Sequence, residues 1–450
     1  MSHGAQERLT SAIAFGLPEN DPLAARIFPG LPGDVKWGLE RTERTLASLG
    51  DPQLDYPVLH VGGTNGKGSV ARIWAEILQA AGFRTGLYTS PHLVSFRERI
   101  LVDGRPLPDE LLEEWSRDLR PLLVREAPSF FEAATALAFL AFSRFGAEVV
   151  VVEVGMGGRL DATNVVNPVL TAITNVGVDH AGILGETQEA IAREKAGILK
   201  PGIPVFTATD DPAAFAVLTE EAALREALLH KVPPPEGRVQ LDGVVLRLVT
   251  KRWGALDLDS PLIGRHQLRN LALAVHALEA LPPRLPVSAR AVKQGVNRTR
   301  VPGRFQVERE RGRTWILDIA HNLDGVRALV RTIEEVNPSR PLIGVVGILD
   351  DKPWKEMLRE LDSVLDAVIL TTVSSAPKAR SWEPEIAAQT LSPDRVSLSA
   401  GVGAAMEVAR TRTGPSGTVV VTGSAYTVGE CLTCLGRIPL EALPVPFDSG

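Results

Sequence analysis

Cysteine is nearly missing from this 450-residue chain, which contains only Cys431 and Cys434. Two cysteines exclude a disulfide framework, and a zinc site would need two more ligands that are not nearby. The C-x-x-C spacing also occurs in redox motifs, but this pair lies late in the chain rather than near the start of a thioredoxin-like unit. We therefore expect two neighbours on the buried face of a helix.

Long apolar runs and an excess of one charge are also missing. No run of about 18 apolar residues occurs, and Met1–Thr10 is polar, without the apolar core of a signal peptide. A net charge of −6 provides no electrostatic footprint for nucleic acid or an acidic membrane. Aromatic residues make up only 5%, but the hydrophobic share of 44% is ordinary for a globular protein. We expect a cytoplasmic, monomeric enzyme of about two or three domains that binds neither nucleic acid nor membranes.

A glycine-rich stretch, Gly62–Ser69, closes one apolar run and opens a helical pattern. Such a turn directs several backbone N–H groups and the helix dipole at one spot that suits phosphate. Lys67 then reaches the β- and γ-phosphates, and a hydroxyl at the start of the helix holds Mg²⁺. The stretch departs from a strict Walker A loop, because Gly68 stands where Ser or Thr should follow Lys and the hydroxyl comes one place later, at Ser69. A tight turn without a ligand is the alternative, but the combination favours nucleotide binding.

The fold class expected is α/β with two domains. In the first, apolar runs alternate with helical patterns, and the continuously apolar strands are typical of a parallel sheet covered on both faces. Its strands are predicted at Tyr56–Val61, Arg84–Tyr88, Glu148–Val154, Val169–Val176 and Pro204–Thr207. The result is a P-loop-type three-layer ATPase domain. A small antiparallel sheet over Arg238–Leu258 and helices over Gln267–Ala280 and Ser288–Asn297 complete it.

The second domain is expected to be a doubly wound, Rossmann-like sheet, with ligands at the carboxyl ends of its strands. Its strands are predicted at Trp315–Ala320, Leu342–Ile348, Ala367–Thr372, Val396–Leu398 and Thr418–Val421. A hinge near Arg298–Gly303 separates the two. We therefore divide the chain into a nucleotide-binding domain, 1–298, and a Rossmann-like domain, 299–450.

Four polar side chains outside the loop have a functional and a plain interpretation. Glu153 ends a strand like that before the loop, so it suits Mg²⁺, although a lone Glu at a strand end is usually solvated or paired. An isolated histidine such as His180 is more often a hydrogen bonder than a ligand. Lys195 lies in a charged helical stretch that is typical of a surface salt-bridge ladder. Arg304 follows a turn, where a guanidinium reaches phosphates if it lies at a domain junction.

The string Gly63-Thr64-Asn65-Gly66-Lys67-Gly68-Ser69 resembles the ATP loop of the Mur ligase superfamily, and its context resembles one branch, folylpolyglutamate synthase/dihydrofolate synthase. The motifs occur in one order from about residue 34 to about residue 430, so the resemblance covers nearly the whole chain. The further matches are Tyr88-Thr89-Ser90-Pro91-His92-Leu93, Arg97-Glu98-Arg99-Ile100, Glu153-Val154-Gly155-Met156-Gly157-Gly158-Arg159-Leu160-Asp161-Ala162-Thr163-Asn164, Asp179-His180, Arg193-Glu194-Lys195-Ala196-Gly197-Ile198, Pro302-Gly303-Arg304-Phe305 and Asp318-Ile319-Ala320-His321-Asn322.

The resemblance implies an ATP-dependent amide ligase that uses two Mg²⁺ ions and a Lys195 carbamylated by CO₂. It implies four catalytic residues, which are Lys67, Lys195, His180 and His321. The implied ATP contacts are Thr64, Asn65, Gly66, Lys67, Gly68, Ser69, Asn270, Arg304 and Asp318. The implied metal ligands are Ser69, Ser90, Glu153 and His180. Folate is expected on Phe131, Leu160, Asp161, Ala162 and Thr163, with the Ser90–Arg99 segment as a further candidate, although Phe131 fits a plain core position equally well. L-glutamate is expected on His321 and Ser424.

Two reactions are compatible with the resemblance. Dihydropteroate plus L-glutamate gives dihydrofolate, and tetrahydrofolate plus L-glutamate gives a polyglutamate. The sequence is compatible with an enzyme that performs either reaction or both. A muramyl-peptide ligase would need a UDP-binding N-terminal domain of about one hundred residues, whereas only about sixty precede Gly62. A nonenzymatic nucleotide-binding switch is the other alternative, but it gives no reason to combine Glu153, His180 and Lys195.

Overall fold

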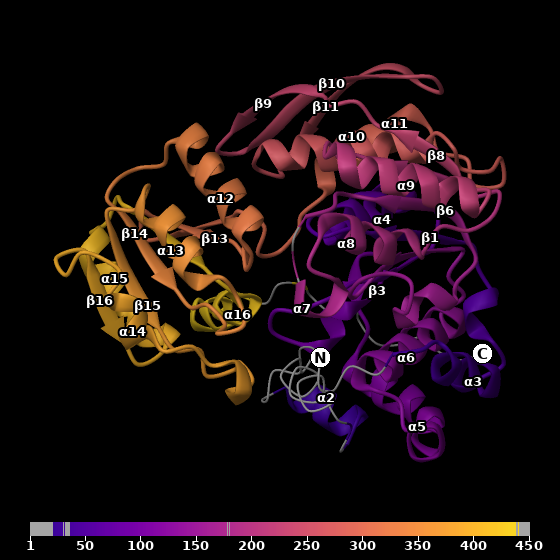
Figure 1. The fold of residues 1–450 in the computed structure, drawn as a ribbon, viewed down its shortest axis with the longest axis horizontal. Helices are drawn as coiled ribbons and strands as arrows, with labels where there is room; N and C mark the ends of the chain where they lie inside the picture. The colour runs from indigo at the N-terminus through magenta and orange to yellow at the C-terminus, as the bar shows by residue number, and fades with distance from the viewer. Residues whose placement is uncertain are drawn as a thin grey trace.

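The computed structural model describes residues 21–29, 31, 37–177, 179, 181–437 and 440, which form two α/β lobes (Figure 1). The first lobe is built on an eight-stranded sheet with the order β4-β3-β2-β5-β1-β6-β7-β8. These strands are β1 (Val58–Gly62), β2 (Thr85–Tyr88), β3 (Ile100–Val102), β4 (Arg105–Pro106), β5 (Val149–Glu153), β6 (Pro168–Ile173), β7 (Pro204–Thr207) and β8 (Leu228–Lys231). From β2 to β8 every neighbouring pair is parallel, and β3 and β4 add an antiparallel edge.

Helices cover both faces of this sheet because its strands are apolar on both sides. Leu59 and Val61 of β1 face one core, where α4 (Lys67–Ala80), α10 (Arg265–Leu278) and α11 (Ala289–Arg298) pack. Trp74 of α4 is fully buried and donates from Nε1 to the carbonyl oxygen of Ala274 at 3.0 Å. The opposite face packs against α2 (Pro22–Ile27), α3 (Glu40–Ser48), α5 (Asp109–Glu126), α6 (Phe130–Arg144), α8 (Gln188–Ala196) and α9 (Pro212–Leu224).

A three-stranded antiparallel sheet extends the first lobe toward the second, as Figure 1 shows above α10 and α12. It consists of β9 (Glu236–Gln240), β10 (Gly243–Thr250) and β11 (Gly254–Ser260). On β10 and β11 buried and exposed residues alternate, with Leu246, Leu248, Leu256 and Leu258 in the core against α10 and α11. This is the period-2 pattern of a sheet with one wet face.

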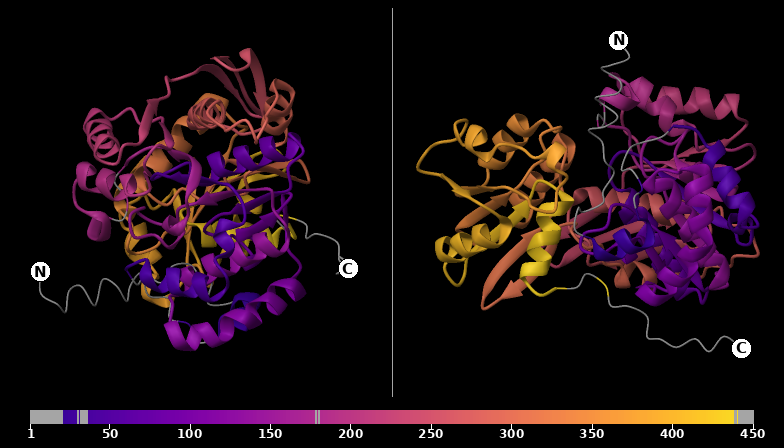
Figure 2. Two further views of the ribbon diagram at one scale, coloured as in Figure 1. Left: turned by 90° about the vertical axis from the view of Figure 1, so that its right-hand side faces the viewer. Right: turned by 90° about the horizontal axis from the view of Figure 1, so that it is seen from below.

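The second lobe has a six-stranded sheet with the order β12-β13-β17-β14-β15-β16, in which only β12 is antiparallel. The strands are β12 (Gln306–Glu310), β13 (Arg313–Leu317), β14 (Leu342–Val346), β15 (Ala367–Thr371), β16 (Val396–Ser399) and β17 (Thr418–Thr422). One face packs against α12 (Leu323–Val336), α13 (Trp354–Asp362) and α14 (Pro384–Ala388), the other against α15 (Val402–Thr413) and α16 (Ala425–Cys434). Figure 2 shows the lobes side by side.

The two-domain α/β fold is confirmed, and each predicted strand is present with ends shifted by a few residues. Strands β3, β4, β8 and β12 were not predicted, because each is short or lies at or next to a sheet edge with much of its surface exposed. The helix that follows the glycine loop begins within the predicted stretch, at Lys67. The cysteine prediction is wrong for Cys434, which is exposed while Cys431 is buried, because the helix ends there.

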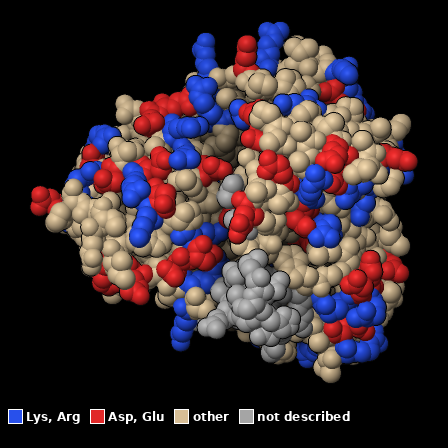
Figure 3. All heavy atoms as spheres, viewed as in Figure 1, with Lys and Arg blue, Asp and Glu red and all other residues tan. Residues whose placement is uncertain are grey.

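No helix among the described residues is both long and apolar enough to cross a bilayer. The face of the molecule in Figure 3 carries Lys and Arg interspersed with Asp and Glu, which agrees with the modest net charge. The carboxyl ends of β1, β5 and β6 in the first sheet and the segments after β13, β14 and β17 in the second line one central cavity between the lobes.

Candidate active site

The glycine loop joins the end of β1 to the start of α4, and two of its glycines are required by geometry. Gly63 has φ 138°, and a Cβ there would lie 1.9 Å from Oγ1 of Thr174. Gly66 has φ 85°, and a Cβ there would lie 2.6 Å from Oδ1 of Asn270. Only glycine adopts such backbones readily, and it lets neighbouring side chains approach the loop. The first N–H groups of α4 have no partner within the helix, so the loop can receive an anion.

The segment after β6 holds this loop in place before any ligand arrives. Oγ1 of Thr64 accepts from the N–H of Gly177 at 2.9 Å and donates to the carbonyl oxygen of Gly177 at 3.1 Å. The N–H of Asn65 donates to Oδ1 of Asn175 at 2.9 Å, and Thr174 donates from Oγ1 to the Asn65 carbonyl at 2.6 Å. These bonds preorganise the loop, which lowers the cost of binding phosphate.

Two lysines donate to backbone carbonyl groups of the loop. Lys67 donates from Nζ to the carbonyl of Thr64 at 3.1 Å, and burial lowers its pKa. Lys195, on α8, is 3% exposed and donates from Nζ to the carbonyl of Gly63 at 3.0 Å. Burial, reinforced by the positive charge of Lys67, lowers the pKa of Lys195 to about 7. The alternative interpretation of Lys195 as part of a surface ladder is therefore wrong; its neighbour Arg193 makes those ion pairs instead.

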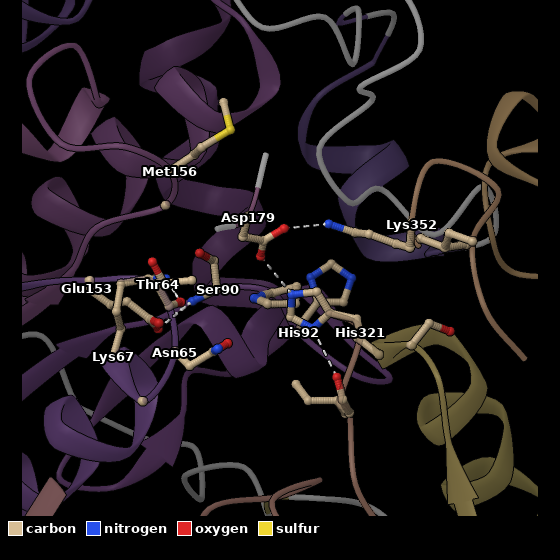
Figure 4. A pocket seen from close by; sticks show the side chains of 18 of the residues that line it. Thr64, Asn65, Lys67, Ser90, His92, Glu153, Met156, Asp179, His321 and Lys352 are labelled. Carbon is tan, nitrogen blue, oxygen red and sulfur yellow. Dashed lines mark hydrogen bonds and ion pairs between the residues drawn. The ribbon is translucent and has the colours of Figure 1, made fainter. Parts of the chain in front are cut away.

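Glu153 ends β5 beside the loop and is 3% exposed (Figure 4). Its Oε2 accepts from the backbone N–H of Ser90 at 3.0 Å. Burial raises the pKa of Glu153, and the nearby charge of Lys67 opposes that rise. A Cβ at Gly68 would lie 3.4 Å from Oε2, so the extra glycine of the loop keeps a side chain away from this carboxylate.

The donor set around Glu153 fits Mg²⁺. Glu153 offers a buried carboxylate, and the backbone N–H of Ser90 is hydrogen-bonded to it. Carboxylate oxygens are the hard ligands that this ion prefers, and Mg²⁺ commonly uses only one or two of them beside phosphates and water. The hydroxyl of Ser69 is buried and accepts from Nε2 of Gln267 at 3.4 Å. His180 lies outside the described residues. Within the described part of the chain, no group of three or more His, Cys, Asp or Glu gathers as a ready-made cage.

A recess beside the loop brings together the predicted ATP contacts Asn270, Arg304 and Asp318, along with Gly66 and Ser69. Asp318 follows β13, and its carboxylate accepts from the N–H groups of Phe305 at 2.8 Å and of Ala320 at 2.9 Å. Burial raises the pKa of Asp318, and the charge of Arg304 opposes that rise. The recess therefore places a fixed carboxylate and a guanidinium beside the loop from the second lobe.

The second lobe also reaches the central cavity through His321. Its Nδ1 donates to the carbonyl of Ile319 at 2.9 Å, and its Nε2 lies 3.5 Å from Oδ2 of Asp179 (Figure 4). Lys352, after β14, forms an ion pair from Nζ to Oδ1 of the same Asp179 at 2.9 Å. Asp179 thus joins the two lobes. The sequence analysis assigned no role to Asp179 or Lys352; the signal available was that both follow strands at the carboxyl edges, where ligands gather.

The central cavity is open to solvent and is lined by residues of both lobes. Its walls include ten of the predicted site residues, namely Thr64, Asn65, Gly66, Lys67, Ser90, Glu153, Lys195, Arg304, His321 and Ser424. Ser424 caps α16, and its Oγ accepts from the N–H of Thr427 at 3.1 Å. The side chains of His92 and Arg99 also line the cavity and lie within the Ser90–Arg99 segment, which the sequence offers as a further candidate for folate. Arg380 lines the cavity too and was not predicted.

The five residues predicted for folate outside the Ser90–Arg99 segment lie behind this cavity rather than on its walls. Asp161 is buried and accepts from the N–H of Met156 at 2.8 Å, while Oγ1 of Thr163 lies 3.0 Å from Nε2 of the buried His60. Phe131 is half-buried, 6.0 Å from the ring of Tyr88. Gly155, Met156 and Gly157 line the cavity in front of this group, which also includes Leu160 and Ala162. In this structure these five residues therefore pack behind the segment that lines the cavity.

Comparison with known proteins matches both lobes. Residues 61–278 match the Mur ligase middle domain, and residues 303–425 match the Mur ligase glutamate ligase domain. Dihydrofolate synthase/folylpolyglutamate synthase of Bacillus subtilis is 35% identical over 88% of this chain and 94% of its own length. A probable bifunctional folylpolyglutamate synthase/dihydropteroate synthase of Haloferax volcanii is 37% identical over 90% of this chain, which spans only 49% of that longer protein. The crystal structure of Mycobacterium tuberculosis folylpolyglutamate synthase with ADP and AMPPCP superimposes with a TM-score of 0.82 and 34% identity, over 89% of this chain and 96% of that one.

Proposed function

Because this chain belongs to the folylpolyglutamate synthase/dihydrofolate synthase branch of the Mur ligase superfamily, we propose that it is an ATP-dependent ligase that joins L-glutamate to a folate, to dihydropteroate, or to both. The observation that carries this proposal is the single cavity that the phosphate loop and Glu153 share with His321, Lys352 and the rest of the second lobe. Phosphoryl transfer and amide formation act on the same carboxyl group, so the residues for both steps must surround one space. This cavity is such a space, because residues of both lobes line it.

The first step is phosphoryl transfer. An oxygen of the substrate carboxylate attacks the γ-phosphorus of ATP, and the bond from that phosphorus to the bridging oxygen breaks. The products are ADP and an acyl phosphate of the substrate. Lys67 and the loop N–H groups neutralise charge on the transferring group, which is where most catalysis of this reaction arises. Mg²⁺ held by Glu153, Ser69, Ser90 and His180 would supply further positive charge to the phosphate oxygens. The recess of Asn270, Arg304 and Asp318 receives the rest of ATP.

The second step forms the amide. The amine of L-glutamate attacks the acyl carbon, the carbon–oxygen bond to phosphate breaks, and the amine gives up a proton as inorganic phosphate departs. We assign His321 and Ser424 to the glutamate side, because both line the cavity from the second lobe. The acyl phosphate hydrolyses in water, so the two lobes must exclude solvent while it exists.

Lys195 is the residue for which a modification is proposed. Carbamylation adds CO₂ to a neutral amine, forms an N–C bond and releases one proton, and it requires an amine that is not protonated. A pKa of about 7, caused mainly by burial, supports this chemistry. The carbamate would convert a buried cation next to the loop into an anion that orients a second Mg²⁺.

The remaining assignments rest on sequence and have structural support of differing strength. We propose that the domains divide at 298 and 299, that the enzyme is a cytoplasmic monomer, and that folate lies in front of Phe131, Leu160, Asp161, Ala162 and Thr163. The position of Gly155 supports the folate assignment, because a Cβ there would lie 2.4 Å from Cζ of Phe131. The ring therefore packs directly on the backbone that lines the cavity.

The proposal is tested by measuring ADP release with dihydropteroate or with tetrahydrofolate, each with and without L-glutamate, and by identifying the product by mass spectrometry. We expect glutamate-dependent ADP release with at least one acid and one amide formed per ADP. D-glutamate is the matched control for the amine. Nucleotide binding without any glutamate-dependent ADP release would contradict a ligase and support a nonenzymatic switch.

A further inference from the structure

Two asparagines from opposite lobes form a reciprocal amide pair at the phosphate loop. Asn65 donates from Nδ2 to Oδ1 of Asn322 at 3.3 Å, and Asn322 donates from Nδ2 to Oδ1 of Asn65 at 3.1 Å. Asn65 lies in the glycine loop, directly before Gly66, and Asn322 is the residue before α12. The two are 257 positions apart in the chain. This is a direct contact between the loop that binds phosphate and the lobe that carries His321.

Other contacts determine which way the amide of Asn322 points. Its Oδ1 accepts from the N–H of Gly325 at 2.8 Å and so caps α12. Its Nδ2 also donates to Oδ2 of Asp179 at 3.0 Å. A backbone N–H can only donate and an ionised carboxylate can only accept, so both oxygen and nitrogen of this amide are assigned by their partners. Asn322 is 3% exposed, and water therefore competes poorly for these bonds.

Asn65 is held just as firmly on its own side. Its N–H donates to Asn175 and its carbonyl accepts from Thr174, so the loop backbone cannot turn its side chain away without breaking bonds within the first lobe. In the second lobe, Asp318 at the nucleotide recess, His321 in the cavity and Asn322 lie within one short segment after β13. Fixing Asn322 on the loop therefore fixes both the recess and the cavity wall.

Resting on the ligase function proposed above, we propose that the Asn65–Asn322 pair is a positioning contact that keeps the second lobe closed on the loaded phosphate loop, so that the acyl phosphate meets the amine of glutamate before it meets water. Loss of two hydrogen bonds of ordinary strength shifts an open–closed equilibrium by roughly tenfold. An open lobe admits water, and the acyl phosphate is then hydrolysed. The consequence is ATP consumption without amide formation, which differs from a simple loss of rate.

The test uses two substitutions that retain the helix cap. Asn322→Ser keeps an oxygen that caps α12 but removes the amide pair, and Asn322→Asp also keeps the cap but places a carboxylate against Asp179. The matched control is Asp211→Ser, which exchanges one capping residue for another at the start of α9, away from the cavity. ADP and amide product are measured in the same samples, with and without L-glutamate.

We expect about one ADP per amide in the unsubstituted enzyme and in Asp211→Ser. The ratio should at least double in Asn322→Ser and rise further in Asn322→Asp, with ADP released even without glutamate. Thermal unfolding of Asn322→Ser should match that of Asp211→Ser. As a readout independent of turnover, small-angle scattering with a non-hydrolysable ATP analogue should give a larger radius of gyration for Asn322→Asp.

Unchanged ADP-to-amide ratios in both Asn322 variants would overturn the inference, as would equal losses of ADP and amide, which indicate a merely structural role. An unchanged radius of gyration in Asn322→Asp would also count against it. Failure of the ligase proposal is recognised separately, because the unsubstituted enzyme itself would then release no ADP in response to glutamate.

Discussion

Replacing Lys195 with Ala is the sharpest test of the chemistry proposed for the phosphate loop. The side chain is 3% exposed and its ammonium faces the Gly63 carbonyl, with Lys67 as the neighbouring charge. If the working form is a carbamate, the substitution removes an anion that orients the second Mg²⁺. We expect kcat to fall at least about 100-fold, the usual effect of removing one group that stabilises charge in the transition state.

The magnitude of the pKa shift explains why this lysine is singled out. At pH 7, with a pKa of about 7, about half of the amine is neutral, whereas a lysine with a pKa near 10.5 is neutral in roughly three molecules of ten thousand. The shift corresponds to about 5 kcal/mol of disfavour for the charged form in the folded protein. For the unmodified lysine this penalty is complete below pH 7 and disappears as the pH rises from 7 to 10.5, because the unfolded state binds more protons in that window.

Acetate and CO₂ provide the assay. Acetate at high concentration should partly restore the activity of Lys195→Ala, since it supplies an anion in the space left by the carbamate. In the unsubstituted enzyme, activity should drop in CO₂-depleted buffer, return with bicarbonate, and respond less to bicarbonate below pH 7, where the amine is protonated. Labelling with ¹³C-bicarbonate detects the carbamate carbon by NMR in solution, without the handling that removes carbamates.

Lys200→Ala is the matched control. Lys200 also has a pKa lowered by burial, but it donates to the Asn164 carbonyl at 3.0 Å and does not line the cavity. We expect near-normal activity and no effect of acetate in this variant. Absence of acetate rescue alone has a steric explanation, so the decisive measurement is turnover: an active Lys195→Ala enzyme refutes the carbamate.

Three further substitutions test the loop and the metal site. Lys67→Ala should lower kcat at least about 100-fold with an unchanged circular dichroism spectrum, because it removes charge from a loop and not from the core; a near-normal kcat would remove the phosphate-loop assignment. Glu153→Gln should raise the Mg²⁺ concentration needed for half-maximal activity at least about tenfold, since an amide is a poor ligand for a hard ion, and an unchanged Mg²⁺ titration would make Glu153 structural. Gly66→Ala should lose about 1–2 kcal/mol of unfolding free energy and raise the KM for ATP, because φ is 85° and the new Cβ meets Asn270. Normal values of both in a urea titration and an ATP titration would contradict that account.

Local sequence patterns were sufficient to predict the loop and most of the strands. Gly63, Gly66 and Lys67 lie between an apolar run and a helical pattern, and this order specifies a strand, a turn and a helix without any knowledge of the rest of the chain. Strand β8 could not be predicted in this way, because three of its four residues are exposed and its stability comes from pairing with β7.

Long-range contacts were beyond the reach of those patterns. Lys195 lies next to Arg193 and Glu194, whose charges indicate a solvent-exposed face, and only the packing of α8 on the loop buries it. Lys352 meets Asp179 across 173 positions of the chain, and nothing in the local sequence of either residue specifies that ion pair. Sequence alone therefore predicted which strand ends line the cavity but not the ion pair that joins the two lobes there.

The strand order of the first sheet places the groups proposed for acid activation on one lobe and leaves the opposite wall of the cavity to the other lobe. The loop follows β1, Glu153 ends β5 and Asn175 follows β6. These are three adjacent interior strands, each of which is paired on both sides. The groups assigned to acid activation in the proposed function therefore lie on interior strands of the first sheet, whereas the opposite wall of the cavity belongs to the second sheet. Under that proposal, a library directed at Arg380 and its neighbours on the second lobe would vary the wall of the cavity opposite the phosphate loop without replacing a group assigned to acid activation.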